Sequence, residues 1–313
     1  MNNHQIVTLT INPSLDKSTH FTGLVAEQKI RCESPRYDAG GGGINVAKAI
    51  HKLGGNSLCI YTSGGSSGEM LEELIKKEGI ESIAIKTNNW TRENFIAFET
   101  QTKAQYRFGF PANELSETEQ NKMVDFISTI KTDYLVISGS LNEGLPTDFY
   151  QKIAETAKAA AIKVIVDTSG EPLRKVLETG VYLIKPNIGE LAKLIGVERL
   201  ELPDVEKAAM NLISKESAEI VVVSLGADGA ILVSKDETHF IKAPKVEKKS
   251  TVGAGDSMVG GMVWALSQNK TLKEVIQMGV SCGTAATMNE GTQLFKREDV
   301  ERLFQELQNK YGN

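Results

Sequence analysis

The sequence predicts an α/β fold in which helices cover both faces of a mainly parallel β-sheet. Short apolar runs rich in Val and Ile recur along the chain, as expected for parallel strands buried on both faces. Helix-like segments stand between these runs, an alternation that is typical of parallel sheets. The 313 residues are 41% hydrophobic and 24% charged, which suits a sizeable core. The length would fit two average domains, but we expect one α/β domain over residues 1–313.

The order of the elements follows from the same pattern. Strands are expected at residues 5–11, 57–61, 134–138, 164–167, 182–185 and 220–224. Helices are expected at residues 44–53, 69–78, 117–130, 147–160, 204–214, 254–266, 272–288 and 297–311. No low-complexity segment or convincing repeat interrupts this alternation.

Two segments, residues 17–37 and 90–110, show little helical periodicity. The second reads as a hairpin, with NFIAFE, a polar turn around residues 100–104, and QYRFGF. Together the two segments are expected to form a small sheet that projects from the main domain as a lid or a dimer surface. The alternative is that they are edge strands of the main sheet.

Charge and cysteine usage limit the class of partner and the compartment. A net charge of −5 gives no reason to expect a nucleic-acid surface, although a few local Arg and Lys residues suffice for an anionic small molecule. The three cysteines are scattered and form no metal-ligand spacing, so we expect reduced thiols in a cytoplasmic protein. Neither a signal peptide nor an apolar run of about 18 residues is present, so no membrane association is expected.

The stretch STVGAGDSMVGG, residues 250–261, places Gly253, Ala254 and Gly255 directly before an acid and an apolar helix-like segment. Glycine permits close approach to the backbone, and the first-turn amides of a helix suit an anion. Asp256 is suited to accept a proton there while the loop holds a transferring phosphoryl group. The alternative is an acid that only interacts favourably with the helix macrodipole.

A second glycine-rich turn, AGGGGINVAKAI, spans residues 39–50. Its glycines allow a ligand to approach, and Asn45 offers the donors and acceptors that a sugar needs. A flexible surface loop is the alternative. Neither turn is a better-known phosphate loop, because position 258 is Met where GxGxxG needs Gly, and GxxxxGK followed by Ser or Thr does not occur.

The segments AGGGGINVAKAIHKLGG and STVGAGDSMVGGMV resemble, in order and separation, the two signatures of the ribokinase-like (PfkB) family of carbohydrate kinases. The resemblance runs from TLTINPSLD to NEGTQL. It implies a ribokinase-like three-layer sandwich with a mainly parallel sheet, plus a small β lid, here from about residues 17–37 and 90–110. It also implies transfer of the γ-phosphoryl group of ATP, with Mg²⁺, to a sugar or sugar-phosphate hydroxyl. A homodimer through the lids and a monovalent cation such as K⁺ are further implied features.

The resemblance also implies roles for individual residues. Asp256 matches the catalytic base, and Gly253, Ala254 and Gly255 match the anion hole. Residues expected to face the sugar are Asp16 in NPSLD, Gly40, Gly41 and Asn45 in the first signature, and Ser140 in ISGSL. Residues expected near ATP are Lys185 and Asn187 in KPNIGE, Ser224 and Gly226 in VSLGADGA, and Thr251, Asn289 and Gly291. Asn187 and Glu190 match an element near Mg²⁺, and they also read as a capping box; both interpretations can hold together.

Four basic residues indicate a substrate that already carries a phosphate. Lys29 and Arg31 alternate, which on a strand would direct both side chains to one face. Arg92 in WTREN and Arg107 in QYRF lie in the other irregular segment, and convergent cations of this kind suit a phosphate. For any one of them taken alone, a solvated surface charge is the favoured interpretation, but Arg92 also matches phosphosugar members of the family.

The first signature bears on which sugar is used. In the family, 1-phosphofructokinases and tagatose-6-phosphate kinases typically carry Gly-Gly-Lys-Gly, whereas this chain has four glycines at residues 40–43. This resembles the family's minor 6-phosphofructokinases and favours fructose 6-phosphate, with fructose 1-phosphate and tagatose 6-phosphate as alternatives. A nucleoside kinase would not need the lid arginines, and a non-catalytic sugar-binding protein would not need Asp256. Gln293 in GTQL, where some relatives have Arg, leaves the details of the cation site open.

Overall fold

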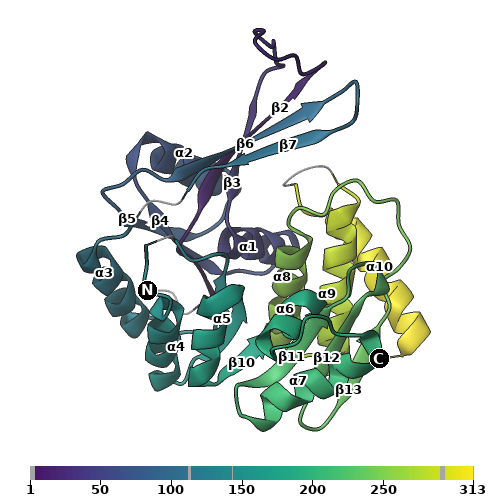
Figure 1. The fold of residues 1–313 in the computed structure, drawn as a ribbon. Helices are drawn as coiled ribbons and strands as arrows, with labels where there is room; N and C mark the ends of the chain where they lie inside the picture. Colours follow the sequence, from purple (N-terminus) through teal and green to yellow (C-terminus); the bar gives the residue numbers. More distant parts are fainter. Residues whose placement is uncertain (1–3, 112–113, 143, 290–292, 313) are drawn as a thin grey trace.

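The computed structural model describes residues 4–111, 114–142, 144–289 and 293–312. Its main element is a nine-stranded sheet with the order β13-β12-β11-β10-β9-β8-β1-β4-β5 (Figure 1). The strands are β1 (Ile6–Thr10), β4 (Leu58–Ser63), β5 (Ser82–Lys86), β8 (Tyr134–Ser138), β9 (Lys163–Asp167), β10 (Val181–Ile184), β11 (Ala218–Ser224), β12 (Ala230–Ser234) and β13 (Thr238–Ile241). Neighbouring strands from β5 to β11 pair in parallel, and β12 and β13 add an antiparallel edge.

Helices cover both faces of this sheet. One layer holds α1 (Gly42–Lys52), α2 (Gly65–Lys77), α8 (Ala254–Ser267), α9 (Leu272–Thr287) and α10 (Arg297–Tyr311). The other holds α3 (Glu117–Thr129), α4 (Phe149–Ala159), α5 (Gly170–Val176), α6 (Ile188–Leu194) and α7 (Val205–Ser214). The predicted three-layer α/β architecture is therefore confirmed.

The alternation of side chains along each strand explains why both faces are apolar. In β1, Val7 and Leu9 pack into the core beneath α3 and α4, whereas Ile6 packs into the core beneath α1 and α8. Burial of alternate residues on opposite faces is what makes such strands continuous apolar runs. The hydrophobic pattern therefore fixes the register of the sheet, and with it the edge where the functional loops meet.

Some elements are missing from the sequence prediction. The strands β5, β12 and β13 and the helices α5 and α6 are not among the expected elements, because they are short and their apolar runs are brief. Only the start of α6 was indicated, by the capping box of Asn187 and Glu190. The helix α2 begins at Gly65, four residues before the predicted start at residue 69, because Gly64 is its N-cap and the polar residues that follow complete its first turn. The six expected strands and eight expected helices are all present, with shifts at their ends.

A second sheet stands apart from the main one, with the order β3-β2-β6-β7. Its strands are β2 (Ser14–Phe21), β3 (Arg36–Gly40), β6 (Arg92–Glu99) and β7 (Gln105–Gly109). The strands β6 and β7 form the expected hairpin, and β2 pairs with β3 and β6 on its two sides. Figure 1 shows this sheet projecting from the body of the molecule. The alternative that these segments are edge strands of the main sheet is therefore wrong.

The prediction that Lys29 and Arg31 share a strand is also wrong. The chain leaves β2 at Phe21 and re-enters the sheet at Arg36, so both residues lie in the exposed loop between β2 and β3. The loop contacts the sheet through a bridge between Phe21 and Cys32 and through hydrogen bonds of Glu33 with His20 and Thr19. Within the described residues, no helix is both long and apolar enough to cross a membrane.

Candidate active site

The residues of interest gather at the carboxyl ends of the parallel strands. The strands β1, β8, β9, β10 and β11 all lead into loops at this edge, where the helices α1 and α8 begin. In open α/β sheets this edge is where ligands bind, because the backbone groups of the loops and helix starts point outward there. The fold thus brings together segments that are far apart in the sequence.

The anion loop, residues 253–256, starts helix α8. Gly253 adopts a left-handed conformation with φ 71° and is the N-cap. This conformation favours glycine, and a Cβ atom at Gly253 would also meet the side chain of Leu294 at 2.5 Å. Ala254 N already donates to the carbonyl oxygen of Thr251 at 3.3 Å. The amides of Gly255 and Asp256 have no acceptor one turn earlier in the helix, so they are available to an anion.

Asp256 lies in the first turn of α8 and touches the other glycine-rich segment. Its Oδ2 accepts a hydrogen bond of 2.8 Å from Nδ2 of Asn45 in α1. Burial and the negative charge of Asp167 raise the pKa of Asp256 to about 6, although Asn45 and Lys185 act in the opposite direction. A carboxylate whose pKa approaches neutrality is a stronger proton acceptor than an ordinary aspartate.

Lys185 follows β10 and is buried beside the anion loop. Its Nζ forms an ion pair of 3.1 Å with Oδ1 of Asp167, at the end of β9. A Cβ atom at Gly255 would lie 3.4 Å from the same Nζ, so the ammonium group is next to the backbone of the anion loop. Burial alone would lower the pKa of Lys185, but the charges of Asp167, Asp256 and Glu190 raise it overall. The lysine is therefore held as a cation next to the backbone of the anion loop.

The glycine run, residues 40–43, is packed rather than flexible. A Cβ atom at Gly40 would meet Oδ2 of Asp16 at 2.5 Å, and one at Gly43 would meet the carbonyl oxygen of Leu9 at 2.6 Å. Gly41 is the N-cap of α1 and has φ 129°, a value that side chains rarely adopt. The alternative of a flexible surface loop is therefore wrong, because the run packs against Asp16 at Gly40 and against Leu9 of β1 at Gly43.

A polar network joins residues of the projecting sheet to Ser140, which follows β8. Oδ1 of Asp16 accepts hydrogen bonds of 2.7 Å from both Ser14 Oγ and Asn94 Nδ2. Oδ1 of Asn94 in turn accepts from Nη1 of Arg92 at 3.0 Å. Asn12 Oδ1 accepts from Nε of Arg92 at 2.7 Å, and Asn12 Nδ2 donates to Ser140 Oγ at 3.1 Å. Three predicted sugar-site residues, Asp16, Arg92 and Ser140, thus belong to one network.

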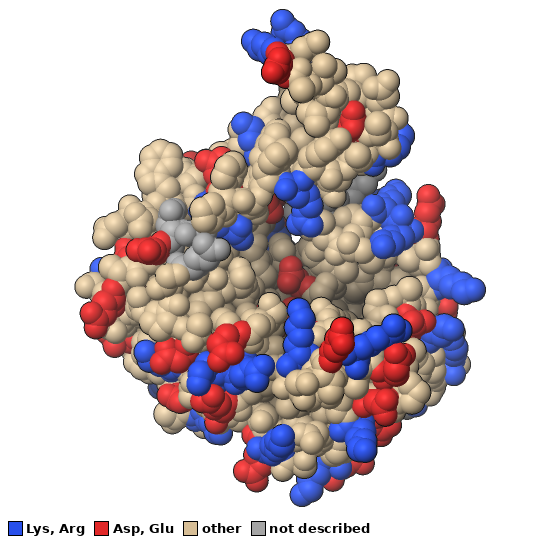
Figure 2. Space-filling model, in the orientation of Figure 1, with Lys and Arg blue, Asp and Glu red and all other residues tan. Residues whose placement is uncertain are grey.

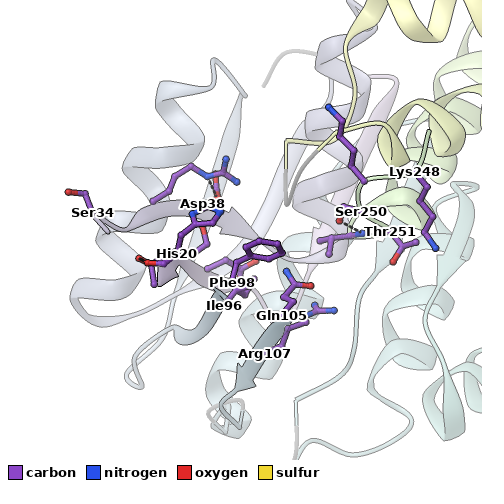
Figure 3. A pocket seen from close by; sticks show the side chains of 16 residues that line it. His20, Ser34, Asp38, Ile96, Phe98, Gln105, Arg107, Lys248, Ser250 and Thr251 are labelled. Atoms are coloured by element: carbon purple, nitrogen blue, oxygen red, sulfur yellow. Dashed lines mark hydrogen bonds and ion pairs between the residues drawn. The ribbon is translucent and has the colours of Figure 1, made fainter. Parts of the chain in front are cut away.

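A cavity of about 580 Å³ separates the four-stranded sheet from the segment before the anion loop. Asp16 and Arg107 line it from the sheet, and Thr251 lines it from the opposite side. Figure 3 shows Arg107 and Gln105 reaching from one wall toward Thr251 and Lys248 on the other. In Figure 2 the hollow between the projecting sheet and the body has acidic atoms in its depth and basic side chains around its rim. Lys29 and Arg31 are not among its lining residues.

The residues expected near ATP lie around the ends of β10 and β11. Asn187 caps α6 and forms a reciprocal capping box with Glu190, with distances of 2.8 and 2.9 Å. Asn187 also bridges to Ser224 at the end of β11, and Gly226 with φ 62° turns the chain after it. The capping interpretation is therefore confirmed. Nδ2 of Asn289 donates to the carbonyl of Ala285 at the end of α9, and Gly291 lies outside the described residues.

A magnesium ion fits this region through the chemistry of its oxygens. Asp167 pairs directly with Lys185, and the charges of Asp256 and Glu190 act on the lysine through space. The described residues nevertheless contain no cluster of three His, Cys, Asp or Glu side chains arranged to hold a metal by themselves. Such a site suits Mg²⁺, which keeps several waters and is bound by one or two carboxylates together with substrate phosphates.

Sequence reasoning missed several residues of the site. Asp167 was expected only as the end of a strand, although an acid at the carboxyl end of a parallel strand is itself a signal. Asn12 and Asn94 lie within motifs that the sequence singled out, NPSLD and WTREN, but nothing in a linear sequence indicates that both meet Arg92. These contacts depend on the pairing of β2 with β6.

The site combines three features: a helix N-terminus beside a buried lysine, a carboxylate with a raised pKa, and a polar network that contains an arginine. Together they define an α/β phosphotransferase. The chain belongs to the pfkB family of carbohydrate kinases, whose model matches residues 9–299. This confirms the family resemblance of the two glycine-rich signatures.

Individual relatives match over almost the whole chain. The chain is 39% identical over 302 residues to the ATP-dependent 6-phosphofructokinase isozyme 2 of Escherichia coli (strain K12), which covers 96% of this chain and 98% of the relative. A crystal structure of the Escherichia coli phosphofructokinase-2 in complex with potassium matches with a TM-score of 0.94 and 39% identity, over 97% of this chain and 99% of that chain. A structure of the same protein in complex with fructose-6-phosphate gives a TM-score of 0.91 and 38% identity, with the same coverage. The ribokinase-like fold is thereby confirmed.

Proposed function

We propose that this protein is an ATP-dependent 6-phosphofructokinase, which transfers the γ-phosphoryl group of ATP to the 1-hydroxyl of fructose 6-phosphate. The observation that carries the proposal is the position of Arg92, whose guanidinium is held by neutral oxygens at one end of the network that contains Asp16. The base Asp256 lies beyond the glycine run, beside Asn45. The names and ligands of the Escherichia coli relative support the same substrate.

The mechanism follows from these positions. Asp16 and Asn45 orient the sugar hydroxyls, and Arg92, Arg107 and Ser140 bind or line the end that carries the phosphate. The oxygen of the sugar 1-hydroxyl attacks the γ-phosphorus, and Asp256 accepts the proton that this hydroxyl loses. The amides of the anion loop and the ammonium of Lys185 stabilise the charge of the transferring group, which is the main requirement of this chemistry. Loss of ADP completes the transfer.

We assign the nucleotide to the region between the anion loop and the loops after β10 and β11. Ser224, Gly226, Thr251 and Asn289 would border ATP. When bound, Mg²⁺ would neutralise the phosphates, and Asn187 and Glu190 would hold it through water. We also propose a monovalent cation near the segment that ends α9. The potassium complex of the Escherichia coli relative supports the presence of such a cation.

The four-stranded sheet serves in this proposal as a lid over the sugar. We also propose that two lids meet in a homodimer; a tetrameric inhibited form of the Escherichia coli phosphofructokinase-2 supports self-association in the family. The three cysteines are free, and such thiols are usual in the reducing cytoplasm, which we propose as the compartment.

Substrate choice is tested by initial rates with MgATP and three sugar phosphates. We expect kcat/KM for fructose 6-phosphate to exceed that for fructose 1-phosphate and tagatose 6-phosphate at least about tenfold, because Arg92 and Asp16 are held at a fixed separation. Unphosphorylated fructose serves as the control for the phosphate itself. Preference for fructose 1-phosphate or tagatose 6-phosphate would contradict the assignment of the sugar and leave the phosphotransferase class intact.

The pH dependence tests the base. Because the pKa of Asp256 is raised to about 6, the proton acceptor is lost as the pH falls through that value. We expect kcat/KM for the sugar phosphate to rise through about pH 6 and to reach a plateau above it. The second ionisation of the sugar phosphate falls in the same range, so the profile should be repeated with unphosphorylated fructose. A fructose profile that is flat from about pH 5 to 8 would contradict the role of Asp256.

A further inference from the structure

We propose that Asn94 is a positioning residue that couples the phosphate-binding arginine to the hydroxyl-binding aspartate. In this view, which rests on the proposed function, the substrate phosphate does more than add affinity. By fixing Arg92 it also fixes Asp16, and so places the sugar for attack. Asn94 on β6 is the connecting group.

The two ends of the Asn94 amide bind different partners, one as an acceptor and the other as a donor. Its amide oxygen accepts from Nη1 of Arg92 at 3.0 Å, and its amide nitrogen donates to Oδ1 of Asp16 at 2.7 Å. A guanidinium can only donate and a carboxylate can only accept, so the two partners together fix which end of the amide faces which. An asparagine satisfies both contacts at once, whereas an aspartate or a leucine at this position cannot.

Asp16 is left with one oxygen for the substrate. Both protein donors, Ser14 Oγ and Asn94 Nδ2, bind Oδ1. Oδ2 lies instead above the glycine run, where a Cβ atom at Gly40 would approach it to 2.5 Å. Asn94 and Ser14 therefore fix the rotation of the carboxylate together, and of these two donors only Asn94 also contacts Arg92.

Arg92 keeps its charge for the substrate. Within the described part of the chain, no carboxylate forms an ion pair with its guanidinium, and its hydrogen bonds go to the side-chain and main-chain oxygens of Asn12 and to Asn94. These acceptors orient the guanidinium without neutralising it. The carboxylate of Asp16 acts on Arg92 only through space, so an incoming phosphate would be the first anion to contact the guanidinium directly. Charge-assisted hydrogen bonds of this kind are stronger than neutral ones.

The pairing of strands explains why Asn94 can reach both groups. Asp16 and Asn94 are register partners in the parallel pair of β2 and β6, and Arg92 precedes Asn94 by two residues on the same face of β6. Glu93 lies between them on the opposite face and is exposed. It offers a matched control on the same strand.

The test is a double-mutant cycle with fructose 6-phosphate and MgATP. We expect Asn94→Ala to lower kcat/KM for fructose 6-phosphate by about 10- to 100-fold and to leave KM for ATP within about twofold. In the Arg92→Met background the same change should cost less than about threefold, because residues that act through one another are not additive. Asn94→Asp, which keeps the shape but places a carboxylate beside Asp16, should lose at least as much activity as Asn94→Ala. Glu93→Gln should change nothing.

Each outcome has a distinct meaning. If the effects of Asn94→Ala and Arg92→Met multiply, or if KM for ATP rises as much as KM for the sugar, Asn94 does not couple the two ends of the substrate. If Arg92→Met leaves kcat/KM for fructose 6-phosphate unchanged, the phosphate site of the proposed function is wrong, and the coupling is wrong with it. Thermal unfolding of each variant separates these results from loss of the fold, and Asn94→Asp carries the test if Asn94→Ala does not fold.

Discussion

Replacement of Asp256 by asparagine is expected to lower kcat by about 10²- to 10⁴-fold, the usual contribution of a positioned general base. Asparagine has the same shape but cannot accept the proton of the attacking hydroxyl. The contact with Asn45, now 2.8 Å from amide nitrogen to carboxylate oxygen, can persist through the new amide oxygen. Binding of the sugar phosphate and of ATP should therefore change little, which calorimetry would measure.

The same substitution is expected to stabilise the fold above neutral pH. The folded-state pKa of Asp256 is raised from 3.8 to about 6, so the ionised carboxylate is less favourable in the folded protein than in the unfolded chain. This penalty is absent below the unfolded pKa, grows as the pH rises, and is complete above the folded pKa. Asparagine mimics the protonated form and removes a penalty of about 1–2 kcal/mol, after allowance for partial exposure.

A matched control separates the catalytic role from general effects of charge. Asp236 lies in the exposed turn between β12 and β13, and Asp236→Asn removes the same charge far from the anion loop. It should leave both kcat and the melting temperature unchanged. Near-normal turnover of Asp256→Asn would overturn the assignment of the base. A lower melting temperature of that variant at alkaline pH would contradict the unfavourable charge.

The sequence predicted the fold well because its signal is physical and local. Strands buried on both faces must be apolar throughout, and this property alone located the six strands that form most of the parallel sheet. The antiparallel strands β12 and β13 were missed, because a short antiparallel hairpin gives little periodicity. The loop that holds Lys29 and Arg31 misled the prediction, because alternation of charge is equally compatible with an irregular segment.

The candidate site was predictable only in part. Glycine runs that precede helices can be recognised in a sequence, so Asp256, Asn45 and the anion loop were predicted as candidate site residues. The interactions that set the pKa of Asp256 come from segments that are distant in the sequence. Asp167 acts electrostatically on Asp256, although the two residues are 89 positions apart in the sequence. No local pattern carries such information, because it arises from the order in which the strands pair.

Replacement of Lys185 by methionine is expected to damage both activity and stability. Its ammonium is buried, lies 3.1 Å from Asp167, and also faces Asp256 and Glu190. Without Lys185, the carboxylates of Asp167, Asp256 and Glu190 lose the positive charge that compensates them. Removal of one partner from a buried ion pair costs about 3–5 kcal/mol, which thermal or denaturant unfolding would measure.

The activity of Lys185→Met should fall for a second reason. Lys185 lowers the pKa of Asp256, so its loss should move the acid limb of the pH profile to higher pH. The transferring phosphoryl group also loses a cation next to the backbone of Gly255. Removal of one such electrostatic group typically costs about 10²–10³ in kcat. Lys193→Met, on the exposed side of α6, is the matched control and should leave stability and rate unchanged.

A double variant distinguishes the two contributions of Lys185. Replacing both members of a buried ion pair by apolar residues can restore stability, because neither charge is then left without a partner. We therefore expect Lys185→Met combined with Asp167→Leu to recover much of the lost melting temperature and none of the lost kcat. Recovery of the rate together with the stability would mean that Lys185 supports only the fold. Recovery of stability alone identifies its ammonium group as part of the phosphoryl-transfer site.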